Sequence, residues 1–311
     1  MKKIVAVFPG QGSQAIGMGK SFIDRYDYAK EALEEANDAL GYDLSKILFE
    51  DGDRLGLTQY TQPAILFVSV TAYKLFENEL PIKPLYALGH SLGELGAVCV
   101  AGGLSFTDAL LVASYRGELM QKASEGAGMM VTLGLGDQSA EALCEAARKE
   151  GKKVWTANYN CDGQITLAGL RADLEAMVDR AKAAGAKRAV LLDMSVASHC
   201  PLLASAQEPL KEILREKLRD DRFVAPVVSN ATAQPYQTKG EAIELLTDQL
   251  VKPVLYKRSV SAIEGETDLF VEFGHGAVLK GLNRKITAKE TIGVANADDL
   301  ESAIEILSEG E

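Results

Sequence analysis

The chain has 311 residues and a formal net charge of −11, with 47% hydrophobic and 25% charged residues. This composition is typical of a folded protein with an ample core, and the length allows one large domain or two smaller ones. The acidic balance argues against a general nucleic-acid binder, so an anionic ligand or partner would have to meet a local basic cluster. Two clusters could serve: Lys280, Arg284 and Lys285 form one, and Lys187 and Arg188 form the other.

The sequence does not indicate a membrane, secreted or metal-binding protein. No apolar run reaches the roughly 18 residues that span a bilayer. The apolar run Ile4–Phe8 is shorter than the core of a signal peptide, so we expect a cytoplasmic protein that binds no membrane. The four cysteines show no spacing typical of a metal site, and Cys99 and Cys144 lie in apolar stretches and are predicted to be buried thiols.

Strand and helix signals alternate along the chain, which favours an α/β fold with a largely parallel sheet. In the first part, Ser105 and Asp108 match a capping box that opens a long helix. The predicted elements of this part are strand Ile4–Phe8, a helix capped by Thr61 that runs toward residue 76, strand 86–88, a helix from 92 to about 100 and a helix from 106 to about 122.

From Gly128 the pattern changes to strand, helix, two strands, helix and strand, which is the order of a ferredoxin-like unit. Its predicted segments are strand 129–135, helix 140–150, strands 154–158 and 164–169, helix 171–185 and strand 189–195. We predict a small domain, residues 126–195, inserted into a larger domain made of residues 1–125 and 196–311. The larger pattern resumes with helix 202–218, strand 227–228, helices 241–250 and 254–263, and strand 270–273.

The sequence ALGHSLGE, residues 87–94, contains a serine in the frame G-x-S-x-G between a predicted strand and a predicted helix. This arrangement places the serine on a tight turn with its Oγ exposed, and the amide of Leu92 then faces an oxygen that becomes negative on attack. A glycine-rich turn whose serine only caps the helix is the alternative. We interpret Ser91 as a nucleophile because of its place between strand and helix.

A serine hydroxyl needs a base to take its proton, and the chain contains three histidines. His90 precedes the serine and is predicted to point elsewhere. His275 follows an apolar strand near the C-terminus, where an α/β-hydrolase carries its base, and His199 lies between the small domain and a helix. Chain position alone slightly favours His275.

Arg116 lies on the inward stripe of the predicted helix 106–122, together with apolar residues such as Val112 and Met120. A buried, unpaired charge is costly, so this arginine needs an anion. An internal carboxylate and the carboxylate of a substrate are both plausible partners, and the sequence favours neither.

Together with other motifs of the chain, these residues resemble those of the malonyl-CoA:acyl-carrier-protein transacylases of fatty-acid synthesis and the acyltransferase domains of polyketide synthases. The matching motifs occur in the family's order across nearly the whole chain, and their combination is highly specific. They are FPGQGSQ (8–14), GHSLGE (89–94), YRGELM (115–120), GQITLAG (163–169), SHCPLL (198–203), SNATA (229–233) and QLVKPVLY (249–256).

The resemblance implies an α/β-hydrolase-like domain interrupted by a small ferredoxin-like domain, and it implies a role for each matched residue. Ser91 would be the nucleophile and His199 the general base and then acid, while the position of His275 is usually not histidine in the family. The other implied roles are these: the amides of Gln11 and Leu92 form the oxyanion hole, Arg116 grips the malonyl carboxylate, Gln249 fixes the histidine in place of a triad aspartate, and Met120 and Ser198 contact the substrate.

The implied activity is a ping-pong transfer of malonyl from CoA, through a serine ester, to the phosphopantetheine thiol of acyl carrier protein. Malonyl-CoA is then a substrate, no bound cofactor or metal is needed, and a monomer is expected. Ser198 leaves specificity open, because serine before the histidine accompanies methyl-branched substrates in modular enzymes but is also common in stand-alone malonyl enzymes. Two rival hypotheses remain: a hydrolase or thioesterase that uses Ser91 with His275, and a non-catalytic scaffold that binds the carrier.

Overall fold

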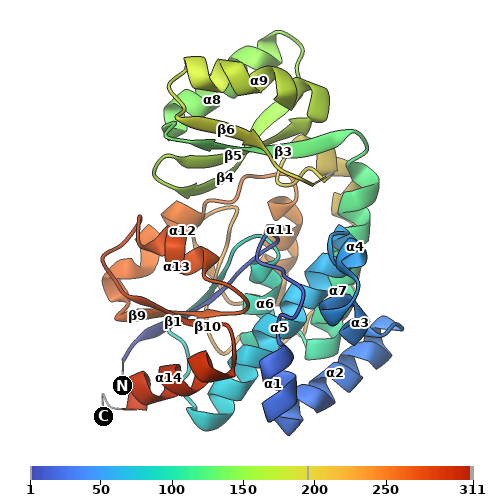
Figure 1. Cartoon of the computed structure of the whole chain (residues 1–311), viewed down its shortest axis with the longest axis vertical. Helices are drawn as coiled ribbons and strands as arrows, with labels where there is room; N and C mark the ends of the chain where they lie inside the picture. The colour runs from blue at the N-terminus through green and yellow to red at the C-terminus, as the bar shows by residue number, and fades with distance from the viewer. Residues whose placement is uncertain (1, 195, 309–311) are drawn as a thin grey trace.

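The larger part of the molecule is built around a six-stranded sheet (Figure 1). The computed structural model describes residues 2–194 and 196–308. The strands of this sheet are β1 (Ile4–Phe8), β2 (Tyr86–Gly89), β7 (Val227–Val228), β8 (Pro235–Tyr236), β9 (Leu269–Phe273) and β10 (Thr291–Val294). Their order is β10-β9-β1-β2-β7-β8, and all pairs are parallel except the edge pair β7–β8.

Helices cover both faces of this sheet, which is why its central strand is apolar throughout. Ile4, Ala6 and Phe8 of β1 pack into one core, and Val5 and Val7 pack into another on the opposite face. The helices of this part are α1 (Lys20–Arg25), α2 (Asp27–Leu40), α3 (Leu44–Phe49), α4 (Gly52–Leu55), α5 (Thr58–Glu79), α6 (Gly93–Val100), α7 (Phe106–Ala123), α10 (Ala204–Lys217), α11 (Lys239–Gln249), α12 (Tyr256–Ile263), α13 (Val278–Asn283) and α14 (Ala297–Ser308).

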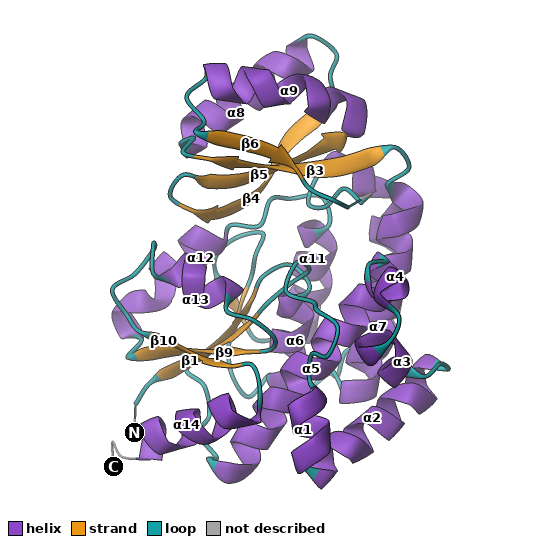
Figure 2. Ribbon diagram, viewed as in Figure 1, coloured by secondary structure: helices purple, strands orange, loops and turns teal. Residues whose placement is uncertain are grey.

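The middle of the chain forms a second, antiparallel sheet that is interrupted by two helices. Its elements are β3 (Ala127–Leu133), α8 (Asp137–Lys149), β4 (Val154–Cys161), β5 (Gln164–Leu170), α9 (Arg171–Ala183) and β6 (Arg188–Leu191). The strand order β4-β5-β3-β6 is that of a ferredoxin-like fold, as predicted. The helices α8 and α9 cover one face of this sheet, and the other face is turned toward the larger part (Figure 2).

The two parts are joined by backbone and ionic contacts as well as by the chain itself. Asn158 of β4 forms an isolated parallel bridge with Val254. The Lys257 ammonium in α12 lies 2.6 Å from a carboxylate oxygen of Asp137 and 2.9 Å from one of Asp162, both in the smaller part. These contacts hold the small sheet over the end of the large one. The domain boundaries themselves, at 125/126 and 195/196, stay a prediction.

The predicted elements are all present, with corrections at their ends. Thr61 does not cap a helix: α5 begins at Thr58, and the Thr61 hydroxyl donates to the Leu57 carbonyl one turn back. The last strand of the small sheet is shorter than predicted, because β6 is an edge strand that pairs with only four residues of β3. Ser195, the predicted end of that strand, lies outside the described residues. Within residues 2–194 and 196–308, no helix has the length and apolarity to cross a membrane.

Candidate active site

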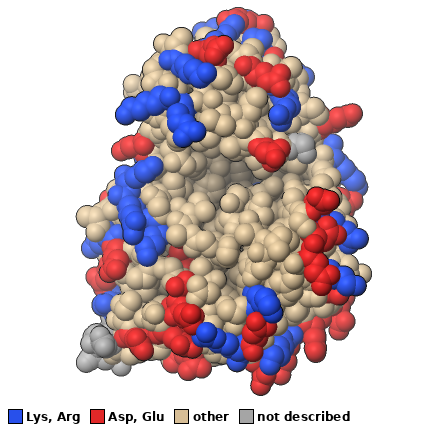
Figure 3. Space-filling model, viewed as in Figure 1, with Lys and Arg blue, Asp and Glu red and all other residues tan. Residues whose placement is uncertain are grey.

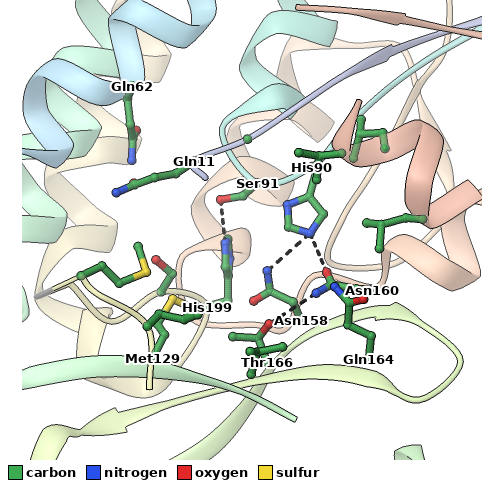
Figure 4. Close-up of a pocket in the computed structure, with 18 of the residues that line it drawn as sticks. Gln11, Gln62, His90, Ser91, Met129, Asn158, Asn160, Gln164, Thr166 and His199 are labelled. Carbon is green, nitrogen blue, oxygen red and sulfur yellow. Dashed lines mark hydrogen bonds between the residues drawn. The ribbon is translucent and has the colours of Figure 1, made fainter. Parts of the chain in front are cut away.

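A cavity of about 290 Å³ lies between the two sheets, where the carboxyl ends of β1 and β2 meet the open face of the small sheet. Figure 3 shows the hollow in the surface, with Lys and Arg side chains gathered along one side of it. The larger part contributes Gln11, Ser91 and His199 to the lining. The smaller part contributes side chains from its strands, among them Met129 and Asn160 (Figure 4).

Ser91 lies on a strained turn between β2 and α6, as the G-x-S-x-G frame predicts. Its φ of 53° is in the left-handed region, which costs a non-glycine residue about 1–3 kcal/mol. The flanking glycines are required by space: a Cβ on Gly89 would lie 1.8 Å from the Gly93 carbonyl carbon, and one on Gly93 would lie 2.0 Å from the Phe8 carbonyl oxygen. The turn therefore brings strand and helix closer together than any side chain allows.

Two carboxamide side chains hold the strained backbone of Ser91. The amide N–H of Ser91 donates to Oδ1 of Asn230 over 2.7 Å, and Nε2 of Gln249 donates to the Ser91 carbonyl over 3.0 Å. Asn230 also donates from Nδ2 to the Gly89 carbonyl at 2.6 Å. The position of the serine is thus fixed from both sides by residues more than a hundred positions later in the chain.

His199 lies directly against the serine. Its Nε2 is 2.7 Å from Ser91 Oγ (Figure 4). Its Nδ1 is 2.6 Å from the backbone carbonyl of Gln249. Because a carbonyl only accepts, Nδ1 carries the proton, and Nε2 is free to accept the hydroxyl proton of Ser91. Burial, together with the nearby Arg116 guanidinium, lowers the pKa of His199 to about 3, so the ring is neutral at neutral pH.

The predicted oxyanion donors lie at the two turns that meet at the serine. The elbow is tied to the end of β1 by a hydrogen bond from the His90 amide to the Phe8 carbonyl. In the part of the chain that the structure describes, the backbone amides of Gln11 and Leu92 have no acceptor. Two unpaired amides next to a nucleophile suit a developing oxyanion. Their role stays a prediction.

Arg116 is buried, with 1% of its surface exposed, and contacts the serine. Its Nη2 is 3.3 Å from Ser91 Oγ and 2.9 Å from Oε1 of Gln249, and its Nη1 is 2.9 Å from Oε1 of Gln62. Among the described residues it makes no ion pair with a carboxylate. Burial lowers the pKa of Arg116 to about 10, so the guanidinium stays charged at neutral pH. It has five N–H groups, and those not used in these contacts can donate to a bound anion.

The remaining predicted residues lie around the same cavity, but the histidine favoured by chain position does not. Met120 and Ser198 both line the cavity, and Met120 Sδ is 3.3 Å from Nε2 of Gln62. His275 borders a separate hollow beside Asn296 and makes no contact with Ser91. The chain-order argument for His275 is therefore wrong, because the segment that reaches the serine is the one that returns from β6 of the small sheet to α10, and it carries His199.

Three buried polar residues of the site were not singled out from the sequence. Gln62 lies in the buried part of α5, Asn230 lies in the loop after β7, and Glu94 is the one charged residue of α6. A lone charged side chain in an otherwise apolar helix is the signal that could have drawn attention to Glu94, because burial requires such a group to find partners. Gln62 gives no such signal, because α5 also carries other polar residues such as Thr61 and Ser69.

Metal binding is not indicated by the geometry either. Over residues 2–194 and 196–308, no three His, Cys, Asp or Glu side chains cluster so that they could hold a metal ion. Cys99 and Cys144 are buried free thiols, as predicted, and so are Cys161 and Cys200. Cys200 packs in a small apolar cluster with Met129.

Comparison with known proteins places this site in a family. Residues 5–302 match the acyl transferase domain family. The chain is 40% identical to the malonyl CoA-acyl carrier protein transacylase of Bacillus subtilis (strain 168), with 99% of this chain and 98% of the relative covered. It is 39% identical to the protein of the same name from Escherichia coli (strain K12), with 95% and 96% covered.

Solved structures agree with this comparison. The malonyl-CoA:acyl carrier protein transacylase of Helicobacter pylori superposes with a TM-score of 0.96 at 45% identity and covers 99% of both chains. A malonyl-transacylase in complex with its type II PKS acyl-carrier protein superposes with a TM-score of 0.94 at 34% identity, covering 98% of this chain and 99% of the other. Given a match over nearly its whole length and a serine in contact with both a histidine and an arginine, the chain belongs to the acyl transferase family.

Proposed function

We propose that the chain transfers a malonyl group from CoA to the phosphopantetheine thiol of acyl carrier protein in fatty-acid synthesis, through an ester on Ser91. The observation that carries this proposal is the contact of one hydroxyl with both a neutral imidazole and a buried guanidinium. Ser91 Oγ lies 2.7 Å from His199 Nε2 and 3.3 Å from Arg116 Nη2. A cation that touches the nucleophile selects an acyl group with its own carboxylate, as malonyl has.

The first half of the cycle loads the enzyme. Ser91 Oγ attacks the thioester carbon of malonyl-CoA while His199 Nε2 accepts its proton. The carbonyl oxygen becomes negative, and the free amides of Gln11 and Leu92 are suited to stabilise it. The C–S bond then breaks, His199 returns the proton to the departing sulfur, and the malonyl ester remains on Ser91.

The second half repeats these steps with a different thiol. The phosphopantetheine thiol of the carrier gives its proton to His199 and attacks the ester carbon. The bond to Ser91 Oγ breaks, and the oxygen recovers its proton from His199. Gln249 supports both halves, because its backbone carbonyl fixes the histidine tautomer and its side chain holds the serine backbone. It takes the place that an aspartate has in a catalytic triad.

The direct test is sequential loading and transfer. The protein is exposed to an equal mixture of malonyl-CoA and acetyl-CoA, and its intact mass is measured before and after carrier protein is added. We expect a single malonyl adduct that disappears as the carrier with its phosphopantetheine arm gains the same mass. A carrier without the arm should gain none. Release of free malonate instead of transfer would favour the thioesterase hypothesis, and the absence of any adduct would favour the scaffold.

A basic cluster at the mouth of the cavity is suited to the carrier. Helix α13 lines the cavity with Leu279 and Leu282, and the cations Lys280, Arg284 and Lys285 lie on this helix or directly after it. Among the described residues none of the three pairs with a carboxylate, and Arg284 and Lys285 are exposed. CoA and the carrier both present a phosphate at the end of the same pantetheine arm, and unpaired cations attract it.

The double substitution Arg284→Glu, Lys285→Glu should raise the KM for carrier protein by roughly tenfold or more, because two favourable charges become unfavourable. The effect should shrink as salt is added. The matched control is Lys187→Glu, Arg188→Glu, which makes the same charge change at the start of β6, away from the cavity lining. If the control raises the KM and the α13 variant does not, the carrier docks on the small domain instead.

Expectations about cofactors, location, oligomeric state and domain division accompany this proposal. The proposed cycle needs no bound cofactor or metal, since the proton carrier and the oxyanion donors are all supplied by the chain. A cytoplasmic location fits carrier-dependent fatty-acid synthesis. A monomer remains our expectation, and so does the division into residues 1–125 and 196–311 around an inserted 126–195.

A further inference from the structure

We propose that Glu94 is the resident counter-ion of Arg116, and that its negative charge opposes the malonyl carboxylate at the guanidinium and so keeps malonyl binding weak enough for transfer. This inference rests on the proposed role of Arg116 in gripping malonyl. It assigns to Glu94 a positioning and specificity role, since the residue acts through its neighbours and does not itself touch the substrate.

Glu94 and Arg116 are linked through a single carboxamide. Both are buried, with 0% and 1% of their surfaces exposed, yet they form no direct ion pair. Gln249 lies between them: its Oε1 accepts from Arg116 Nη2 at 2.9 Å, and its Nε2 donates to Glu94 Oε2 at 2.7 Å. The N–H end of the amide thus faces the anion and its carbonyl end faces the cation, and the two charges fix this orientation.

The other partners of Glu94 are neutral donors. The backbone amide of Asn230 donates to Oε2 over 3.0 Å, and the Tyr236 hydroxyl donates to Oε1 over 3.1 Å. These bonds satisfy the carboxylate without cancelling its charge. A buried carboxylate needs a cation nearby, and Arg116 is the one whose attraction acts on it.

When Glu94 is ionised, its charge and that of Arg116 therefore sum to zero before substrate binds. A malonyl carboxylate at Arg116 brings a second negative charge into the field of one guanidinium, and Glu94 repels it through a medium of low polarity. A group that is gripped too strongly would be loaded but not released to the carrier. The resident anion weakens the hold on malonyl and leaves a neutral acyl group unaffected.

Glu94 is also a group of the site that is expected to titrate near neutral pH. Burial raises the pKa of Glu94 to about 7, although its hydrogen bonds and Arg116 act in the opposite direction. The titratable side chains that face it keep their charge state there, because the pKa of Arg116 is about 10 and burial raises that of Tyr236 well above its usual value. Behind Gln249, the pKa of His199 is about 3.

The test is Glu94→Gln, which keeps the shape of the side chain and removes its charge. The new Oε1 can accept from Asn230 and Gln249, and the new NH₂ can donate to the Tyr236 hydroxyl. In single-turnover loading at pH 8, we expect the half-saturating concentration of malonyl-CoA to fall by roughly three- to tenfold, and that of acetyl-CoA to move far less. In the unsubstituted protein, lowering the pH from 8 to 6 should have the same selective effect, and Glu94→Gln should lose this pH dependence.

The matched variant is Glu94→Asp, which keeps the charge but draws it back by one methylene. If Glu94 were only a scaffold, Glu94→Gln would behave like the unsubstituted protein and Glu94→Asp would be impaired. An equal shift for both acyl-CoAs, no shift, or weaker malonyl binding in Glu94→Gln would overturn the proposal, whether or not Glu94→Asp folds.

If the unsubstituted protein does not distinguish malonyl-CoA from acetyl-CoA, the proposed role of Arg116 fails as well. If it does and Glu94→Gln changes nothing, only the role of Glu94 fails.

Discussion

Replacing Ser91 with alanine should abolish malonyl loading, with a rate that falls by roughly 10⁴-fold or more. The substitution removes only the hydroxyl group, and its oxygen lies against His199 Nε2 and Arg116 Nη2. The measurement is the intact mass of the protein after brief exposure to malonyl-CoA, which should show no malonyl adduct. The fold should persist, because Asn230 and Gln249 hold the backbone of residue 91 and not its side chain.

A pair of histidine variants shows whether this serine works with the expected base. His199→Ala should reduce loading by several orders of magnitude, because no other side chain among the described residues contacts Ser91 Oγ as an acceptor. His275→Ala is the matched control and should load at the normal rate, since His275 borders a different hollow. Loading that survives in the first variant and disappears in the second would restore the hydrolase hypothesis.

The fold could be predicted from sequence where the pattern is local. The strand before the serine, the two close glycines and the inward face of α7 are each visible within a few residues, and the structure agrees with all three. The helices between residues 20 and 55 were missed because three of them have only four to six residues, too short to show a period. The fourth, α2, has 14 residues and an apolar face that includes Ala29, Ala32 and Ala36, so this helix could have been predicted from its period.

The site could be predicted only in part, because its contacts join distant segments. The choice between His199 and His275 depends on which loop reaches the serine, and spacing in the sequence does not determine this. The partners of Arg116 illustrate the same limit: Gln62 and Gln249 lie 54 and 133 positions away. Both are neutral, although a search guided by charge alone expects a carboxylate. The resemblance to a known family supplied Gln249, and nothing in the motifs pointed to Gln62.

Arg116→Ala should remove the preference for malonyl over acetyl groups. The guanidinium is the buried cation next to Ser91 Oγ, and no carboxylate of the described chain forms an ion pair with it. Breaking a buried charge pair costs roughly 3–5 kcal/mol, which corresponds to a loss of selectivity of more than a hundredfold. The measurement is the ratio of kcat/KM for malonyl-CoA and acetyl-CoA. Equal use of the two by the unsubstituted enzyme would contradict the carboxylate-binding role.

The same variant should also change the pH dependence of loading. Burial and then the Arg116 charge lower the pKa of His199, and the neutral ring is the form that accepts the serine proton. Without the cation, the pKa of His199 should rise, so loading should begin to fail at a higher pH as the solution is acidified. Arg116→Lys keeps the charge and loses the planar fork, so it should keep the acidic limit low while selectivity drops. A limit that stays unchanged in Arg116→Ala would mean that burial alone sets the basicity of His199, and that the arginine serves recognition only.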